Sequence, residues 1–247
     1  MAIKVTIYNE NVHEKQEPAI AKVYPEGIHT ALKNGLACDD FEFRIATLDM
    51  PENGLSEEVL NDTDVLIWWG HVAHGAVLPE VVDRVVKRVN DGMGFIALHS
   101  AHHSLPFTRL TGCPCNLQWR EAGEKCRVWS VNPNHPICKD VPNSFLVEHE
   151  EMYGEPFVIP EPDETVFISW FEGGNVFRSG VTYKRGAGKI FYFQNGHESY
   201  PNYYDKNVLQ VIKNAVYWAH NPNKIVMECW QQANSVEKIY SLDQTNK

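Results

Sequence analysis

The sequence predicts an α/β fold: a three-layer, mostly parallel twisted sheet with helices on both faces, extended by antiparallel strands. Three observations support this prediction. Strand-like and helical segments alternate over the first hundred residues, which is the order that produces parallel sheets. Residues 64–71 and 94–98 are nearly all apolar, as in strands buried on both faces. Glycine-rich turns join apolar segments between residues 165 and 193, as in β-hairpins.

The N-terminal elements follow in chain order. Residues 3–8 alternate apolar and polar side chains, which predicts the first strand. The polar residues 9–17 are expected to form a loop. Residues 25–34 are expected to form a helix, because Pro25 suits its first turn and Gly35 suits the position after its end.

Two further helix-strand steps complete a β-α-β-α-β order. The second strand is expected at 41–48, and the third is the apolar run 64–71. A helix is expected to begin at Pro79 and to end before Gly92. Its buried face carries valines at helical spacing: Val81, Val82, Val85, Val86 and Val89. The run 94–98 is then the next buried strand.

The second half of the chain is less regular. Residues 105–165 are rich in proline and cysteine, and strands are expected there at 145–153 and just beyond at 165–171. The turns at 172–175 and 185–188 connect the last three strands as hairpins.

A last amphipathic helix is expected over residues 206–219, because apolar side chains recur at helical spacing and Asn221-Pro222 follows. The chain has 247 residues, which suits one large domain. We expect a single α/β domain over residues 1–220 and a C-terminal tail, 221–247, that is partly helical or disordered.

Composition and charge exclude several classes of partner. The formal net charge is −10 and no run of lysine or arginine offsets it, which argues against nucleic acid and anionic membranes. No apolar run approaches the roughly 20 residues of a membrane span. The first residues lack a basic segment followed by a long apolar one, so the cytoplasm is the expected compartment.

Known cofactor motifs are weak or missing. The six cysteines include no C-x-x-C pair, so free thiols are expected, with a zinc site at Cys113, Cys115, Cys126 and Cys138 as the alternative. There is no P-loop, and no G-x-G-x-x-G follows the first strand, so neither a nucleotide nor a flavin is indicated.

Histidines follow three of the expected core strands. His71 ends the run 64–71, His99 follows 94–98, and His197 follows the last strand. Ligands of open α/β sheets bind at the carboxyl ends of the strands, so these three side chains are expected on one rim. Imidazoles are ligands of divalent metals, and we expect His71, His99 and His197 to bind one, with zinc the first candidate. The alternative for each is an ordinary hydrogen-bonded histidine.

Further candidates surround this rim. Glu150 and Glu10 are candidate bases, and His99 and His197 are candidate catalytic groups themselves in a metal-free site. The expected substrate-binding residues are polar side chains close to the strand ends: Asn9, His74, His102, Tyr153 and Glu198. A solvated acidic strand remains the alternative for Glu150 and its neighbour Glu151.

Several long segments resemble one known family. "DVLIWWGHVAH", "GFIALHSAHHS", "EHEEMYGEPFVIPEPDE", "SWFEGGNVFRSG" and "GKIFYFQNGHESYP" closely resemble the ThuA-like (trehalose utilisation) proteins, and the resemblance covers roughly residues 3–220. It implies a fold like that of class I glutamine amidotransferases, a flavodoxin-like arrangement, and a role in the metabolism of disaccharides or their 3-keto derivatives.

The resemblance also argues against glutaminase activity. Where amidotransferases carry a G-x-C-x-G motif, this chain has residues 97–101, with His99 in place of the cysteine. Their His-x-Glu motif is matched only by adjacent His197 and Glu198. An imidazole cannot form the thioester that glutamine hydrolysis requires.

Two functions therefore stay open. The first is an enzyme that acts on a disaccharide or its 3-keto derivative through a histidine-lined pocket, with or without a metal. The second is a non-catalytic carbohydrate-binding or regulatory subunit. In both cases the expected ligand is a small sugar, and related folds suggest a homo-oligomer.

Overall fold

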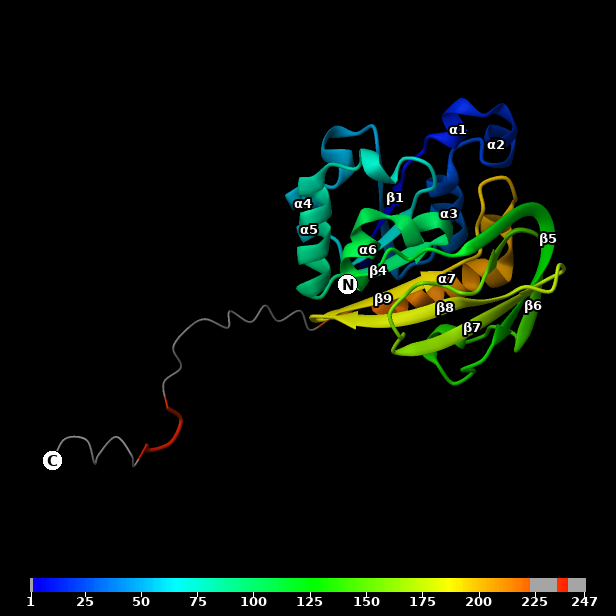
Figure 1. Cartoon of the computed structure of the whole chain (residues 1–247). Coiled ribbons are helices and arrows are strands. Elements are labelled where there is room, and N and C mark those ends of the chain that lie inside the picture. The colour runs from blue at the N-terminus through cyan, green and yellow to red at the C-terminus, as the bar shows by residue number, and fades with distance from the viewer. Residues whose placement is uncertain (1, 223–234, 240–247) are drawn as a thin grey trace.

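The computed structural model describes residues 2–222 and 235–239. Within them, nine strands form one sheet in the order β2-β1-β3-β4-β9-β8-β7-β5-β6 (Figure 1). The expected tail, 221–247, lies largely outside the described residues. None of the described helices has the length and apolar character that a membrane span requires.

Five strands form the parallel half of the sheet. In sheet order they are β2 (Phe41–Thr47), β1 (Ile3–Asn9), β3 (Val65–Trp69), β4 (Gly94–Leu98) and β9 (Gly188–Phe193). Every residue of β3 and β4 is buried, as their apolar sequences predict.

The other four strands extend the sheet in antiparallel pairing. They are β8 (Val176–Arg185), β7 (Glu164–Phe171), β5 (Gln118–Ser130) and β6 (Ser144–Gly154). The two expected hairpins are present, with Gly174 and Gly186 at positive φ of 90° and 57° in their turns. Because β9 pairs with β4 on one side and with β8 on the other, it joins the two halves.

Helices cover the parallel half on both faces. The chain moves from β1 to β2 in one direction along the sheet and from β3 to β4 in the other, so right-handed crossovers place α3 and α5 on opposite faces. α7 packs with α3 on one face, and α4 and α6 pack with α5 on the other (Figure 1). The helices are α1 (His13–Gln16), α2 (Pro18–Val23), α3 (Ile28–Leu36), α4 (Glu57–Asn61), α5 (Pro79–Asn90), α6 (Leu105–Thr111) and α7 (Lys206–Ala219).

The expected α/β fold, with helices on both faces of the sheet and an antiparallel extension, is confirmed, although the described strands make as many antiparallel pairings as parallel ones. Two local expectations are wrong, and one strand was not expected. The expected loop 9–17 contains α1 and leads into α2. The helix expected at 25–34 begins at Ile28 and ends at Leu36, so Gly35 lies inside it. A side chain at Gly35 would come within 2.6 Å of Leu209 in α7, so close helix packing explains this glycine.

The third difference is β5, which the sequence did not predict. Its first five residues are all exposed, so no alternation of buried and exposed side chains marks them. Pairing with β6 and β7 holds this strand in place, and both pairings depend on residues far away in the sequence.

Candidate functional site

The three strand-end histidines meet at the carboxyl ends of the parallel strands. His71 lies two residues beyond β3, His99 directly follows β4, and His197 follows β9. The ring centroids of His99 and His197 are 5.1 Å apart, and that of His71 lies 5.4 Å from His197 and 6.0 Å from His99. The structure therefore brings together the three residues that the sequence suggested as metal ligands.

Glu151 from β6 completes the cluster. One ligand atom from each of His71, His99, Glu151 and His197 lies within 4.8 Å of the others. The Oε2 atom of Glu151 is 3.1 Å from Nε2 of His99 and 3.7 Å from Nε2 of His197. Although these distances are short, this buried oxygen has no hydrogen bond of acceptable geometry. The donor atoms thus converge on a common region instead of forming aligned hydrogen bonds with one another. We call these four residues the central cluster.

The backbone at His99 is unusual. Its φ of 52° lies in the left-handed region, which costs free energy for a residue other than glycine. His99 is also the first residue of a 3₁₀ turn, 99–103, so it occupies a sharp turn between a strand and a helix. Such turns place a side chain above the end of a strand, as in nucleophile elbows, but the His99 side chain is fully buried here, and neither it nor His197 lines the cavity described below. The strained position therefore holds an imidazole over the strand ends.

A backbone carbonyl fixes the orientation of the His99 ring. Nδ1 of His99 lies 2.9 Å from the carbonyl oxygen of Gln194, which has to accept from an N–H. The proton therefore sits on Nδ1, and Nε2 faces Glu151. A ligating histidine almost always donates its other N–H in this way.

The cluster also sets the charge of its imidazoles. Burial alone would lower the pKa of His99, but nearby carboxylates, with Glu151 first, outweigh it and raise the pKa to about 9. Burial and, after it, the neighbouring His99 together lower the pKa of His197 to about 4. Burial likewise lowers the pKa of His71. In the metal-free protein, one protonated imidazole therefore pairs with Glu151 beside two neutral ones.

Glu198 lies behind His71. Its Oε1 is 2.6 Å from Nδ1 of His13 and 3.3 Å from Nδ1 of His71, and the three residues form a second donor group. Burial raises the pKa of Glu198, but its contact with His13 and the nearby imidazoles outweigh this and lower it to about 2. The carboxylate is therefore ionised and lies beside the His71 ring without a hydrogen bond of acceptable geometry to it, and it does not line the cavity described below.

Glu150 and Glu10 support loops. Glu150 is fully buried and accepts from the backbone N–H groups of Gly196 (2.8 Å) and His197 (3.2 Å). Adjacent strand residues point to opposite faces, so Glu151 faces the cluster while Glu150 anchors the loop that carries His197. Glu10 accepts from the backbone N–H groups that follow His71, at Val72 (2.8 Å) and Ala73 (3.0 Å). The structure thus places both expected bases outside the cavity.

Asn9 is buried as well. Its amide donates to Oε1 of Glu14 at 2.7 Å, and its Oδ1 accepts from the backbone N–H of Asn11. These contacts fix the turn after β1, and Asn9 has no place in the cavity lining.

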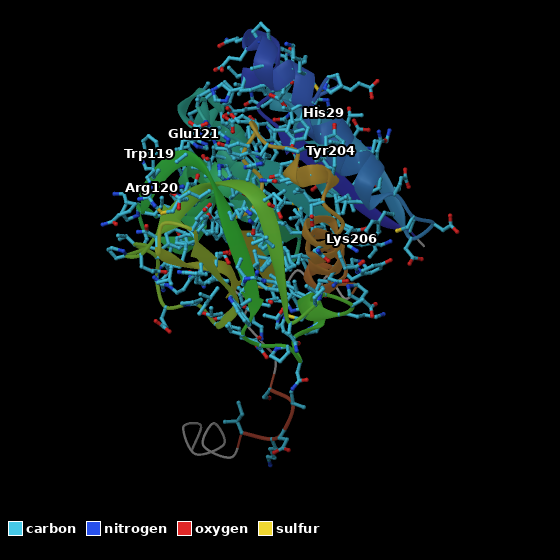
Figure 2. The ribbon with its side chains drawn as sticks, turned by 90° about the vertical axis from the view of Figure 1, so that its right-hand side faces the viewer. His29, Trp119, Arg120, Glu121, Tyr204 and Lys206 are labelled. Carbon is cyan, nitrogen blue, oxygen red and sulfur yellow. The ribbon has the colours of Figure 1, made fainter. Side chains whose placement is uncertain are left out.

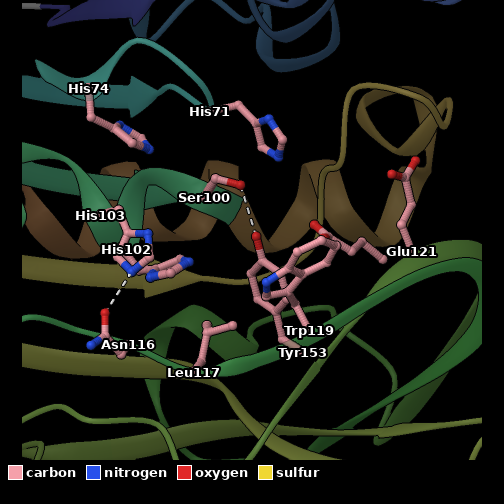
Figure 3. A pocket seen from close by; sticks show the side chains of 11 residues that line it. His71, His74, Ser100, His102, His103, Asn116, Leu117, Trp119, Glu121 and Tyr153 are labelled. Atoms are coloured by element: carbon pink, nitrogen blue, oxygen red, sulfur yellow. Dashed lines mark hydrogen bonds between the residues drawn. The ribbon is translucent and has the colours of Figure 1, made fainter.

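A cavity of about 320 Å³ opens beside the central cluster (Figure 3). Three of the expected substrate-binding residues line it: His74, His102 and Tyr153. The Tyr153 hydroxyl lies 2.8 Å from Oγ of Ser100 and 3.3 Å from Nε2 of His99, and its ring stacks on that of His99. Tyr153 therefore links the cluster to the cavity.

Sequence reasoning missed the segment 116–121, which supplies Asn116, Leu117, Trp119 and Glu121 to the cavity. Figure 2 shows Trp119, Arg120 and Glu121 together along β5. No strand-end position or motif marks this segment, because only the pairing of β5 with β6 brings it over the parallel strands.

The five cysteines of the described residues belong neither to the central cluster nor to the cavity lining. Among the described residues, neither donor group with metal-ligand spacing contains a cysteine. Cys38, Cys113, Cys115, Cys126 and Cys138 are free thiols.

Comparisons with known proteins agree with this fold. The family model described as "Trehalose utilisation" matches residues 4–219. Among curated proteins, none matches the chain.

Solved structures show the same fold at low identity. A ThuA-like protein from Parabacteroides merdae is 15% identical with a TM-score of 0.65, over 89% of this chain and 90% of that one. One from Bacteroides uniformis is 18% identical with a TM-score of 0.62, over 87% and 90%. The PurLQS structure from Thermotoga maritima is 12% identical with a TM-score of 0.54, over 88% and 99%. By its family match over residues 4–219, the chain belongs to the ThuA, or trehalose utilisation, family.

Proposed function

We propose that this protein is a sugar-metabolism enzyme that holds a divalent cation in the central cluster and acts on a disaccharide or its 3-keto derivative. One observation carries the proposal. Three imidazoles and one carboxylate place donor atoms within 4.8 Å of one another, and a buried oxygen of Glu151 lacks a hydrogen bond. In the metal-free protein the protonated His99 lies 3.1 Å from this carboxylate, and a cation would take the place of that proton as its partner, because buried carboxylates are normally paired or coordinate metals.

The donor set suits a first-row divalent metal. Imidazole nitrogens and a carboxylate oxygen bind zinc, and the same ligands suit manganese and iron. His99 also has an outer partner, because its Nδ1 lies 2.9 Å from the Gln194 carbonyl oxygen, whereas Nδ1 of His71 lies 3.3 Å from Glu198 without a hydrogen bond of acceptable geometry. A divalent cation in such a site would polarise a carbonyl group or activate a water.

The chain's own residues supply proton transfer. Glu121 lines the cavity, and its carboxylate lies 3.9 Å from Nε2 of His197. Partial burial raises the pKa of Glu121, and Glu151 and Glu198 raise it further. A carboxylate with a raised pKa suits removal of a proton beside the carbonyl of a keto sugar. Glu121 therefore takes the role that the sequence suggested for Glu150 or Glu10, and the Tyr153 hydroxyl donates to the substrate.

A metal-free binding function is the second candidate. The 3.1 Å approach of His99 to Glu151 lets the cluster balance its own charge without a cation. In that case the pocket binds carbohydrate without turnover, as a regulatory or binding subunit would. Glutaminase activity is not part of either candidate, because His99 occupies the strained turn.

Metal analysis separates the candidates. We expect protein purified without a histidine tag to contain about one divalent cation per chain, and His99→Ala and Glu151→Gln to lose it. His149→Ala is the matched control, because His149 is exposed on β6 outside the cluster. Metal-free wild-type protein that takes up no zinc, manganese or iron would refute the metal site. Turnover of 3-keto disaccharides then distinguishes the enzyme from the binder.

The expected compartment and assembly are part of the same proposal. A cytoplasmic protein from Salmonella typhimurium LT2 shares the fold at 9% identity and a TM-score of 0.59, which supports the cytoplasm. A homo-oligomer remains the expectation, and light scattering of the purified chain tests it.

A further inference from the structure

We propose that a second cavity, at the amino ends of the parallel strands, binds a small anion that carries a phosphate group, with Lys139, Lys189 and Lys213 as its cationic groups. We call it the lysine cavity. It needs neither the metal nor the sugar proposed above, because none of the described residues lines both cavities. Its position, the pairing of its charged side chains and the hydrogen bonds within its walls support this assignment.

The lysine cavity is separated from the central cluster by the length of the parallel strands. Asp40, in its lining, directly precedes β2, and Lys189 is the second residue of β9, whereas His197 follows the carboxyl end of β9. The last turns of α7, which runs alongside β9, form one wall (Figure 1). The volume of about 780 Å³ is within the range for small-molecule sites. The cavity is therefore a separate site that can hold a metabolite.

Three lysines line this cavity without a carboxylate partner. In the part of the chain that the structure describes, Lys139, Lys189 and Lys213 form no ion pair, although the net charge of the chain is −10. Lys189 and Lys213 are also partly buried. Lysines are rarely buried unless an opposite charge pairs with them, so an anion in the cavity would stabilise all three.

The two carboxylates of the lining do not neutralise these lysines. Asp40 accepts from the hydroxyl of Tyr217 at 2.7 Å. Asp140 lies in a turn at a φ of 58°, and within the described ranges neither aspartate forms an ion pair. Three ammonium groups against two carboxylates leave one positive charge in excess at the cavity. The cavity is thus a locally cationic region of an acidic protein.

Lys189 is held in place by the end of α7. Its Nζ donates to the backbone carbonyl of Trp218 at 2.7 Å and lies 5.4 Å from the centroid of the Trp218 ring. An ammonium group has three N–H donors, so two remain for other acceptors. Burial and, after it, the nearby Lys184 lower the pKa of Lys189. An anion beside Lys189 would oppose both effects, because it favours the charged form.

Hydrogen bonds from Asn214 fix the second wall, which is formed by residues 136–140. The Asn214 amide donates to the backbone carbonyl of Lys139 at 2.6 Å, and its oxygen accepts from Gln210 at 2.9 Å. Gln210, Lys213 and Asn214 follow helical spacing, so they line the cavity from one face of α7. The backbone of Lys139 is therefore held beside the helix face that carries Lys213.

A phosphate group matches these lysines better than a carboxylate does. It carries a charge of about −1.5 to −2 and has three acceptor oxygens, so it can pair with more than one ammonium group. A carboxylate carries a single negative charge. Lysine binds phosphate as a compact point charge with three donors. Free phosphate and phosphate esters share this chemistry, and the volume of the cavity leaves room for the organic part of an ester.

Calorimetric titration of the full-length protein tests the proposal. The probes are inorganic phosphate, glycerol 3-phosphate and adenosine 5′-monophosphate, with acetate as the singly charged comparison. We expect at least one phosphate probe to bind about tenfold more tightly than acetate, or better. If inorganic phosphate binds most tightly, free phosphate is the ligand, whereas tighter binding of an ester identifies a phosphorylated metabolite.

Removing one ammonium group at a time tests the lysines themselves. Lys213→Gln and Lys189→Gln should each weaken phosphate binding about tenfold, because each removes one charged donor. Lys206→Gln is the matched control, because Lys206 is exposed at the start of the same helix and does not line the cavity (Figure 2). It should bind as the wild type does, and the melting temperature of each variant shows whether it is folded.

Four results would overturn the proposal. They are the absence of binding by every phosphate probe, equal binding of acetate, wild-type affinity in folded Lys213→Gln and Lys189→Gln variants, and an equal loss of affinity in Lys206→Gln. Phosphate binding that disappears in His99→Ala but persists in the lysine variants would place the anion at the central cluster, so it belongs to the third result.

Discussion

Replacing Glu150 by alanine tests whether this carboxylate anchors the loop of His197. The variant removes the acceptor of three backbone N–H groups, at Glu151, Gly196 and His197, and of the side-chain amides of Asn195 and Asn202, which lie 3.3 Å and 2.9 Å away. Each buried donor left unsatisfied costs about 1–3 kcal/mol. Burial of the charge itself is unfavourable and raises the pKa of Glu150, so its removal offsets part of that loss.

We therefore expect Glu150→Ala to lower the free energy of unfolding by about 3 kcal/mol. Urea denaturation followed by far-UV circular dichroism measures it. Glu148→Ala is the control, because Glu148 is exposed on the same strand and makes a long contact of 3.6 Å with Lys125. Its effect should stay within about 0.5 kcal/mol.

The outcome also distinguishes an anchor from a catalytic base. If Glu150 is an anchor, the Glu150→Ala variant should lose both stability and bound metal, because His197 is no longer held at the cluster. If the free energy of unfolding of Glu150→Ala is within about 1 kcal/mol of the wild-type value but the variant has lost turnover, Glu150 is not an anchor and the catalytic role suggested by the sequence is correct.

Three further predictions concern pH, packing and the metal. His74 binds a proton near pH 6.5 in the unfolded chain but only near pH 4 in the folded protein, where burial lowers its pKa. As the pH falls from 6.5 to 4, the unfolded chain therefore binds more protons and the free energy of unfolding decreases. In His74→Gln, the decrease in the free energy of unfolding between pH 7 and pH 4 should be smaller by about 2–3 kcal/mol, as measured by urea denaturation at both pH values. An equal decrease in the variant and the wild type would contradict the lowered pKa of His74. Gly94→Ala should cost about 1–3 kcal/mol, because the new methyl would lie 2.8 Å from Ala219 in α7. A methyl group at Gly75 would meet no atom within 4 Å, so Gly75→Ala should leave the free energy of unfolding unchanged in the same denaturation experiment. Equal losses of stability in the two variants would refute the packing argument. Chelation of the metal should lower the free energy of unfolding by about 2.7 kcal/mol if the free metal had been at 100 times its dissociation constant. An identical melting temperature with and without chelator would exclude a bound cation.

Local sequence patterns determined most of the fold and the centre of the site. The apolar runs that became β3 and β4 and the helix between them are determined by side-chain periodicity, which is a local property. Because parallel strands end on the same rim, the order of elements was enough to bring His71, His99 and His197 together.

Tertiary structure alone decided the rest. The sequence could not distinguish Glu150 from Glu151, because both are buried and only the position of β6 in the sheet decides which one faces the histidines. Trp119 and Glu121 reach the cavity through β5, which pairs with strands far away in the sequence. Local patterns carry no information about such pairings. The sequence by itself thus determined the parallel sheet and its histidine-bearing rim, while long-range strand pairing decided which carboxylates and which tryptophan complete the site.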